Sequence, residues 1–263
     1  MLSKPIKLST FHLHAPIGHG AMGMVWQGEH AFEKTPVAIK VIMPHRAQEA
    51  RYAQLFRREV RAIAALDHPG IIRIYDHGII DAAAATRSQG RLIEGSPYLV
   101  MEWSPLKPLA SPSNPVPHWN ALKSVLLGIL DVLAHVHARG IIHRDLKPAN
   151  VLADPLKLGI QGLKVIDFGL ARIHSLLGAS TQEAGGVVGT PGYMAPEQRS
   201  YAQLHTQGPW TDLYALGRVA WWLSMQNPNM RDPEQVYQTL NKPHALNPRF
   251  EIPEGFQDWL RCL

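Results

Sequence analysis

The alternation of apolar and polar residues near the N-terminus predicts an antiparallel sheet. Three alternating segments, Phe11–Ile17, Met24–His30 and Val37–Met43, are separated by glycine-rich or polar turns. A period of two places every second side chain on the same face of a strand. Two further apolar segments, Ile71–Ile80 and Tyr98–Trp103, predict a hairpin whose strands are joined by a long alanine-rich loop.

One helix is predicted to interrupt these strands. Residues 46–67 carry apolar residues at helical spacing, namely Tyr52, Phe56, Val60 and Ile63. This spacing predicts a helix with one buried face. Glu59 lies on the same stripe, where an unpaired carboxylate would be costly, so we expect a basic partner for it.

The chain changes character after residue 103. Residues 104–118 contain five prolines and no periodicity, which favours a connection between two lobes over a proline-rich docking site. A long helix that ends near Gly140 is then predicted from a stripe of Leu122, Val125, Leu126, Ile129, Leu133 and Val136. The remaining predicted elements are a buried strand at Leu163–Ile166, an apolar core helix at Asp212–Met225, and short helices near Pro233–Leu240 and Gly255–Leu263.

These elements indicate an α+β protein with residues 1–103 as a mainly β lobe, 104–118 as a linker and 119–263 as a mainly helical lobe. The net charge of +5 comes from scattered Lys and Arg residues. It is compatible with phosphate chemistry, but no basic run indicates nucleic-acid binding.

Cysteine usage and hydropathy restrict the compartment. A single cysteine, Cys262, excludes an internal disulfide framework and a four-cysteine zinc site, and it suits a reducing compartment. The N-terminus lacks the apolar segment of a signal peptide, and no run of about eighteen apolar residues is present to span a bilayer. We therefore expect a cytoplasmic segment without a membrane span, with a membrane anchor beyond Leu263 left open.

A glycine motif lies between the first two predicted long strands. IGHGAMGMV spaces Gly18, Gly20 and Gly23 as G-x-G-x-x-G. The dinucleotide-binding version of this motif opens a helix directly after the glycines, whereas Met24–His30 alternates as a strand does. A hairpin with bare backbone amides is able to close over phosphates, because glycine has no Cβ to hold them away. Alone, the motif is equally compatible with an ordinary glycine-rich turn.

VAIK, at 37–40, places Ala38 and Lys40 on one face of a strand. A lysine directed into a cleft needs an anion, and Glu59 is a candidate. Their pairing would leave the Lys40 ammonium able to donate to a ligand phosphate as well. A surface salt bridge is the alternative, which the inward placement of both side chains disfavours.

The segment IIHRDLKPANVL, at 141–152, concentrates charges between two apolar pairs that predict short strands. Asp145 and Asn150 offer oxygen ligands suited to hard cations, and Lys147 adds a mobile positive charge. Asp167 follows a predicted buried strand, which holds its carboxylate on rigid backbone. Magnesium takes one or two protein oxygens together with substrate phosphates, a demand that Asp167 and Asn150 meet. A solvated charge cluster is the alternative.

Taken in order, IGHGAMGMV, VAIK, Glu59, HRDLKPAN, DFG and GTPGYMAPE at 189–197 resemble the bacterial eukaryotic-like serine/threonine protein kinases over essentially the whole chain. The resemblance implies a two-lobed fold, with a small antiparallel β N-lobe carrying one key helix and a larger, mainly α C-lobe. It also implies ATP- and Mg2+-dependent phosphoryl transfer to serine/threonine hydroxyls of proteins in signal transduction, with autophosphorylation, for which a homodimer is one arrangement.

The resemblance implies a role for each catalytic residue. Asp145 would orient the substrate hydroxyl and Lys147 would lie beside the γ-phosphate. Lys40, paired with Glu59, would bind the α- and β-phosphates. Thr190, together with Lys147, resembles the pattern of serine/threonine specificity.

The remaining implied residues bind metal and nucleotide. Asn150 and Asp167 would hold magnesium. The implied nucleotide pocket consists of Ile17, Gly18, Gly20, Gly23, Val25, Ala38, Lys40, Met101, Glu102, Trp103 and Leu152.

Two departures from the family pattern concern regulation and stability. Bacterial members often carry threonine a few residues before the position of Thr190, where this chain has Gln182, Glu183 and Ala184. We therefore expect autophosphorylation at Thr181 or Ser180, with a permanent charge from Glu183 as the alternative. The resemblance implies that Arg144 and Arg172 form the basic pocket that binds this charge. In the family, Glu197 pairs with an arginine that follows a motif like WLRCL, in which this sequence ends. The resemblance thus implies that the C-terminal helix is missing. Loss of the arginine partner of Glu197 would then cost about 3–5 kcal/mol of folding stability.

Two alternatives stay open on the sequence. One is a truncated or inactive nucleotide-binding scaffold, a pseudokinase, against which the presence of Lys40, Asp145, Asn150 and Asp167 argues. The other is a small-molecule kinase of the same fold, which the complete GTPGYMAPE segment disfavours because that segment shapes a peptide groove in the family.

Overall fold

A computed structural model of the chain describes residues 5–20, 23–42, 50–113, 116–154, 157, 162–168, 190–199, 205–226, 238 and 246–263. The chain forms two compact units. The first comprises Met1–Asp67 with Ile72–Pro105, and the second comprises His68–Ile71 with Leu106–Leu263. Most of the proline-rich connection thus belongs to the second unit, as does the short segment that begins at His68.

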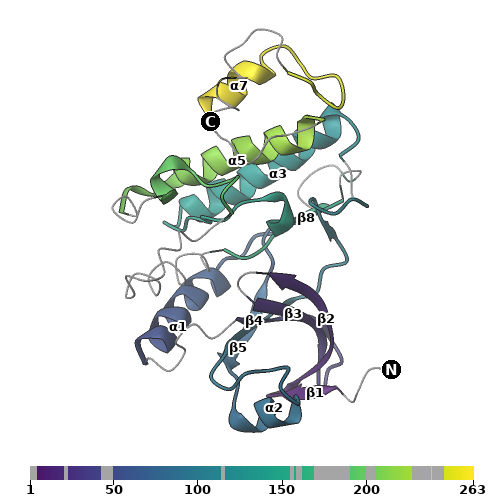
Figure 1. Cartoon of the computed structure of the whole chain (residues 1–263), viewed down its shortest axis with the longest axis vertical. Helices are drawn as coiled ribbons and strands as arrows, with labels where there is room; N and C mark the ends of the chain where they lie inside the picture. Colours follow the sequence, from purple (N-terminus) through teal and green to yellow (C-terminus); the bar gives the residue numbers. More distant parts are fainter. Residues whose placement is uncertain are drawn as a thin grey trace. The chain divides into compact units, whose positions relative to one another are not determined.

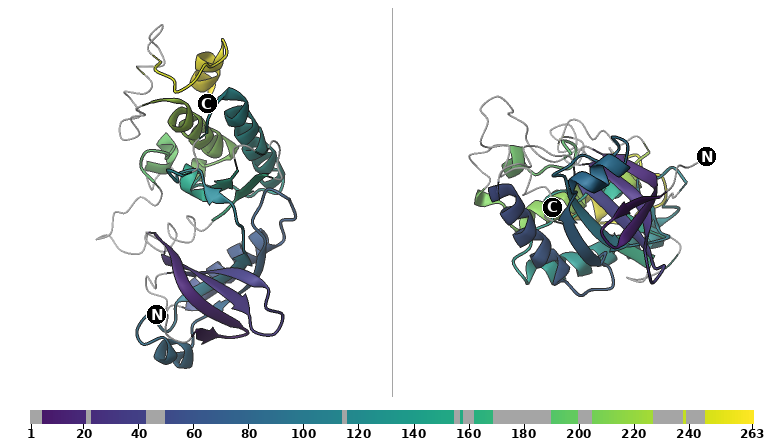
Figure 2. Two further views of the ribbon diagram at one scale, coloured as in Figure 1. Left: turned by 90° about the vertical axis from the view of Figure 1, so that its right-hand side faces the viewer. Right: turned by 90° about the horizontal axis from the view of Figure 1, so that it is seen from below.

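The first unit is built on one curved sheet, which can be followed in Figures 1 and 2. Its strands are β1 (Ile6–Leu8), β2 (Phe11–Gly20), β3 (Gly23–His30), β4 (Pro36–Ile42), β5 (Ile74–Ile79) and β6 (Pro97–Glu102). They are ordered β1-β2-β3-β4-β6-β5, and every neighbouring pair is antiparallel. The antiparallel sheet is confirmed. Strand pairing continues to Gly20 opposite Gly23, so these glycines lie in strand ends and not in an open turn.

The apolar core of this unit lies on one face of the sheet. Trp26, Ile39 and Val100 are each at most 1% exposed, and they come from three adjacent strands, β3, β4 and β6. They belong to a cluster that also contains Leu13 and Val37. Alternation along each strand leaves the residues between them for the opposite face.

Helix α1 (Ala50–Ala64) has the predicted buried stripe, because Phe56, Val60 and Ile63 are only 1%, 0% and 6% exposed. The prediction of a long alanine-rich loop between β5 and β6 is wrong. Ala82–Arg87 forms a short helix, α2, and the Asp81 carboxylate accepts a hydrogen bond from the Ala84 N–H at 2.6 Å. Alanine has the highest helix propensity, and aspartate at the N-cap satisfies an otherwise unpaired N–H group.

The second unit packs helices around α3 (Trp119–His137), and α5 (Pro209–Ser224) lies beside α3 (Figure 1). Its other elements are β7 (Lys107–Pro108), β8 (Val151–Ala153), β9 (Leu163–Val165), the 3-10 turns η1 (Pro148–Asn150) and η3 (Pro196–Arg199), and α7 (Phe256–Cys262). The predicted stripe of α3 is fully buried, and Gly140 has a left-handed φ of 70°. Helix α3 is long and apolar enough to cross a membrane, but half of that stretch is buried within the unit, as in a core helix.

Two predictions near these helices need comment. Ile141 and Ile142 were expected to form a short strand, but they lie in irregular backbone and are half-buried. The hydrogen bond from Ile141 N to Val136 O closes the C-terminal end of α3, so the Ile141 amide is not available to pair with a strand. The helix predicted near Pro233–Leu240 falls almost wholly outside the described residues.

Candidate active site

The loop that leads into η1 gathers an acid, a cation and an amide. Asp145 is 7% exposed, and its Oδ2 accepts hydrogen bonds from Lys147 Nζ at 2.7 Å and from Asn150 Nδ2 at 3.0 Å. Asn150 Nδ2 also donates to the Asp145 carbonyl at 2.7 Å. The ammonium and the amide thus hold the buried carboxylate in one orientation through hydrogen bonds, of which the one from the charged donor is the stronger kind.

Thr190 joins this group from a distant part of the sequence. Its hydroxyl accepts a hydrogen bond from Lys147 Nζ at 2.8 Å and donates to Asp145 Oδ1 at 3.3 Å. The hydroxyl thus bridges the acid and the cation. The structure therefore brings together Asp145, Lys147, Asn150 and Thr190, which sequence motifs placed in two separate segments.

His143 fixes the backbone at Asp145 through a hydrogen bond that its ring accepts. It is 0% exposed, its Nε2 lies 2.9 Å from the Ile166 carbonyl, and its Nδ1 accepts from the Asp145 N–H at 3.2 Å. These partners assign the neutral tautomer with the proton on Nε2, since Nδ1 faces a donor. The buried Phe168 ring packs 4.6 Å from the His143 ring. The loop that contains His143 and Asp145 is thereby joined to the segment that contains Phe168.

Asp212 is a supporting residue that the sequence analysis missed. Its carboxylate is fully buried in α5, where it accepts from the backbone N–H of His143 at 2.8 Å and of Arg144 at 2.9 Å. His137 Nε2 lies 2.8 Å from the same carboxylate. The signal in the sequence was an acid on a helix predicted to be all core, which requires buried partners.

Two glutamines hold Arg144, whose φ of 66° is left-handed. Gln198 Nε2 donates to the Arg144 carbonyl at 2.7 Å, and Arg144 Nε donates to Gln207 Oε1 at 2.9 Å. A left-handed non-glycine residue costs free energy, so these bonds and those of Asp212 maintain the turn. Nothing in the sequence motifs indicated either glutamine.

The residues expected to hold magnesium have the oxygen ligands that this ion requires. Both Asn150 Nδ2 protons face Asp145, which leaves the Oδ1 oxygen as the part of the amide for a cation. Asp167 follows β9 by two residues, is half-buried and has a left-handed φ of 66°. A carboxylate and an amide oxygen are hard ligands that suit Mg2+. The residues therefore fit the ion.

In the first unit, five of the expected nucleotide-binding residues share one face of the sheet. Val25 lies opposite both Gly18 and Lys40, and Ala38 lies opposite Met101. Directly opposed residues and residues two apart on a strand point to the same face. Gly18, Val25, Ala38, Lys40 and Met101 therefore lie on the face opposite the Trp26–Ile39 core.

Lys40 is unusual on this face because it is only 5% exposed. A buried ammonium needs an anionic partner. Glu59 is half-buried on α1, and its pairing with Lys40 stays a prediction.

Other expected nucleotide-binding residues differ in their exposure. Ile17 is 48% exposed on β2, while Trp103, after β6, and Leu152, on β8 of the second unit, are half-buried. Glu102 is anchored, since its backbone N–H donates to the Arg73 carbonyl at 2.8 Å. Gly23 has a φ of 141°, and a Cβ there would lie 2.0 Å from the Val41 carbonyl oxygen, so the chain needs glycine at this position.

The segment after Thr190 rests on α5. Arg218 is 5% exposed, and its Nε donates to the Gly192 carbonyl at 2.8 Å. Burial raises the pKa of the neighbouring Tyr193, and the positive charge of Arg218 partly opposes this rise. Glu197 Oε1 accepts from the Thr211 hydroxyl at 2.6 Å. The expected phosphorylation sites Thr181 and Ser180, together with Arg172, lie outside the described residues.

Comparisons with known proteins show the family of the chain. The model of the protein kinase domain family matches residues 11–258. Serine/threonine-protein kinase Pkn1 of Myxococcus xanthus is 36% identical over 218 residues, which cover 83% of this chain and 29% of that protein. Serine/threonine-protein kinase PknB of Mycobacterium leprae is 32% identical over 222 residues, which cover 83% of this chain and 33% of that protein. The crystal structure of a mutant Mycobacterium tuberculosis PknI kinase domain has a TM-score of 0.59 at 25% identity, over 87% of this chain and 78% of that one.

The chain belongs to the protein kinase domain family. The expected resemblance to bacterial serine/threonine kinases and the two-lobed kinase fold are confirmed. The family generally uses ATP and Mg2+ and acts on proteins. The chain spans about a third of the length of the curated relatives it matches.

Proposed function

We propose that this domain transfers the terminal phosphoryl group of ATP to serine and threonine hydroxyls of proteins. The supporting observation is the buried Asp145 carboxylate, which contacts the Lys147 ammonium and the Thr190 hydroxyl. This arrangement has a base that accepts a proton and a cation that offsets phosphate charge. Both are what phosphoryl transfer requires of the protein, because positioning and charge stabilisation supply most of the catalysis.

In the proposed reaction, a substrate hydroxyl oxygen bonds to the γ-phosphorus while the bond from that phosphorus to the β,γ-bridging oxygen breaks. ADP leaves with the electron pair of the broken bond. Asp145 orients the hydroxyl and takes its proton. Lys147 donates to the moving phosphoryl oxygens, and its present contact with Thr190 keeps the ammonium beside Asp145.

The first unit supplies the proposed nucleotide contacts. Lys40, with Glu59 as partner, donates to the α- and β-phosphates, and the strand ends around Gly18, Gly20 and Gly23 cover them. Adenine would contact an apolar surface and the backbone of the connection. The residues of the first unit proposed for these contacts are Ile17, Val25, Ala38, Met101, Glu102 and Trp103, and Leu152 is the one proposed from the second unit.

Asn150 Oδ1 and the Asp167 carboxylate are the proposed metal ligands. Magnesium bound there supplies charge neutralisation to the phosphates. Asn150 itself has a second role, because its Nδ2 holds the Asp145 carboxylate in place.

The test is incubation of the protein with ATP and Mg2+, followed by mass spectrometry for phosphoserine and phosphothreonine. Asp145→Asn should lower the rate of phosphate incorporation by about 100-fold or more, as expected for loss of a general base. Asp258→Asn, a change of an exposed acid on α7, is the matched control and should retain the rate. Equal incorporation by wild type and the Asp145 variant would refute the proposal.

The same experiment addresses regulation and the alternative. We propose autophosphorylation at Thr181 or Ser180, within a homodimer, in the cytoplasm. Phosphopeptide mapping that finds neither residue modified would remove this part alone. A nucleotide-binding scaffold predicts saturable ATP binding without incorporation into the chain or into an added protein substrate.

A further inference from the structure

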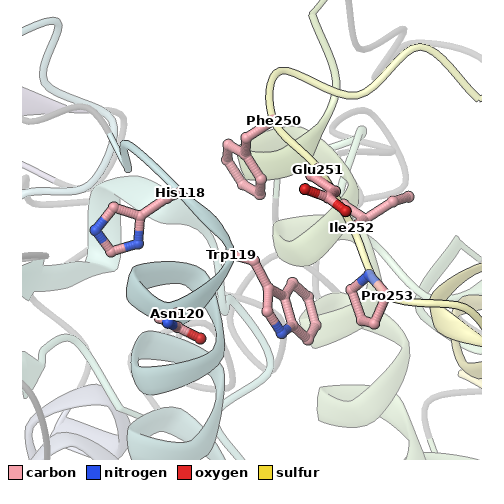
Figure 3. Close-up of a pocket in the computed structure, with 7 residues that line it drawn as sticks. All are labelled: His118, Trp119, Asn120, Phe250, Glu251, Ile252 and Pro253. Atoms are coloured by element: carbon pink, nitrogen blue, oxygen red, sulfur yellow. The ribbon is translucent and has the colours of Figure 1, made fainter.

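A cavity of about 390 Å3 lies in the second unit and shares no residue with the candidate active site. Two segments that are far apart in the sequence border it. His118, Trp119 and Asn120 come from the start of α3, and Phe250–Pro253 come from the loop before α7 (Figure 3). Among the described residues, its walls combine aromatic and aliphatic surfaces with one carboxylate, that of Glu251.

The aromatic wall is held in place by packing. The Trp119 ring meets the Phe256 ring edge-on at 5.1 Å, and the Phe256 ring stacks on that of Trp259 at 5.7 Å. Phe256 is 4% exposed. Trp119 is therefore fixed by a buried neighbour and is itself only half-buried.

The loop wall is anchored to the end of α5. Arg249 donates from its backbone N to the Ser224 carbonyl at 2.7 Å and from Nε to the Met225 carbonyl at 2.6 Å. Gln226 N donates to the Asn247 carbonyl at 3.0 Å. Both walls are thus positioned without a ligand, which lowers the entropy lost on binding.

The charges at the cavity favour a cation. Glu251 is exposed and has no ion pair among the residues that the structure describes. His118 Nδ1 accepts from the Ala121 N–H at 3.1 Å, so this ring caps the N-terminus of the helix. The dipole of α3 favours negative charge at the start of the helix. The negative charge of the Glu251 carboxylate at the cavity would nevertheless repel an anionic ligand. Within the described part of the chain, no Lys or Arg lines the cavity.

The geometry points to a binding site for an arginine side chain of a partner polypeptide. A planar guanidinium stacks on aromatic rings and pairs with a carboxylate through two parallel hydrogen bonds, so Trp119, Phe250 and Glu251 suit it together. The exposed rim of His118, Asn120 and Pro253 lets the polypeptide backbone remain outside while the side chain enters. This site is independent of phosphoryl transfer.

The probe is the peptide acetyl-Gly-Arg-Gly-amide, titrated into the protein while the Trp119 indole N–H is followed by NMR. A saturable shift is expected. The same peptide with citrulline, a neutral isostere of arginine, should bind about fivefold more weakly or worse, since it loses both the ion pair and the cation–π contact. Equal binding of the citrulline peptide, or no saturable shift, would overturn the inference.

Two variants locate the site. Glu251→Gln should weaken the arginine peptide about fivefold, whereas Glu254→Gln, which changes a nearby exposed acid outside the cavity lining, should not. Equal effects of the two changes would contradict the site. Phosphate incorporation should be the same in both variants and in wild type, which separates this test from that of the proposed function.

Discussion

The Asp212 carboxylate accepts a hydrogen bond from the backbone N–H of His143 at 2.8 Å. It also accepts from the Arg144 N–H and contacts His137, although it is fully buried on a helix that is otherwise mostly apolar. One carboxylate thus binds the two residues that precede Asp145 in the loop. The position of the proposed base depends on an acid in the core of the second unit.

Replacement of Asp212 by Asn should reduce stability and turnover together. The Asn side chain keeps one acceptor oxygen but replaces the other with an NH2 group. This NH2 group cannot accept from the backbone N–H of His143 or Arg144, so at least one of these N–H groups loses its partner. We expect a loss of about 1–3 kcal/mol in the free energy of unfolding, measured by urea denaturation, and a lower kcat. The exposed Asp258→Asn should change neither. An unaltered urea midpoint for the Asp212 variant would show that the loop is held by other contacts.

The Thr190 hydroxyl is predicted to matter for rate more than for stability. Thr190→Val preserves the shape of the side chain but removes the bridge between Lys147 and Asp145. Steady-state assays should show a kcat lowered about tenfold, with a similar KM for ATP, because the two charged groups lose a shared partner. Thr190→Ser keeps the hydroxyl and should recover most of the rate. If Ser and Val variants behave alike, the hydroxyl has no such role.

Much of the fold follows from local patterns, because strands of period two and helices of period 3.6 are visible in a single sequence. The buried stripe of α1 at Phe56, Val60 and Ile63 is an example. The alanine-rich segment was misread because its helix depends on a cap, Asp81, and its alanines carry no amphipathic pattern. The extension of β2 to Gly20 was also missed, since strand pairing and not side-chain alternation holds those glycines.

The candidate site divides in the same manner. Asp145, Lys147 and Asn150 lie within one motif, and their contacts are short in sequence. Asp212 lies 69 positions after His143, and Gln198 lies 54 positions after Arg144, so only the folded chain brings them together. Asp212 and Gln198 hold the loop through hydrogen bonds to its backbone. A single sequence does not indicate which distant segments are joined by such a bond, and it shows only that a buried polar group needs a partner.

Gly23 and Gly18 are predicted to tolerate alanine differently, although both belong to the same motif. A Cβ on Gly23 would lie 2.0 Å from the Val41 carbonyl oxygen, at a φ of 141°, whereas the nearest described atom to a Cβ on Gly18 would be Val25 Cβ at 3.9 Å. Gly23→Ala should therefore lower the melting temperature of the protein, while Gly18→Ala should leave it nearly unchanged. Calorimetry of the two variants checks this. Equal melting temperatures would mean that the strand ends readjust.

Tyr193 should make the protein less stable at alkaline pH. Burial raises the pKa of its hydroxyl in the folded state above the ordinary value of about 10. The unfolded chain then loses this proton first, so the contribution is constant below pH of about 10 and declines as the pH rises further. Urea denaturation at several pH values between about 8 and 11 should show a smaller decline in the free energy of unfolding for Tyr193→Phe than for wild type. Parallel curves would indicate that the hydroxyl ionises equally in both states.

Arg218 is predicted to position the peptide-binding segment from beneath. Its buried guanidinium donates to the Gly192 carbonyl, next to Tyr193, and the segment that contains both residues resembles the part of kinases that shapes the peptide groove. Arg218→Met should raise the KM for a peptide substrate about tenfold and leave the KM for ATP nearly unchanged, because the lost hydrogen bond comes from a charged donor. Arg218→Lys should recover part of this effect, and the exposed Arg261→Met should have none. If the KM values for peptide and ATP rise equally, Arg218 supports the general stability of the unit and not the peptide-binding segment.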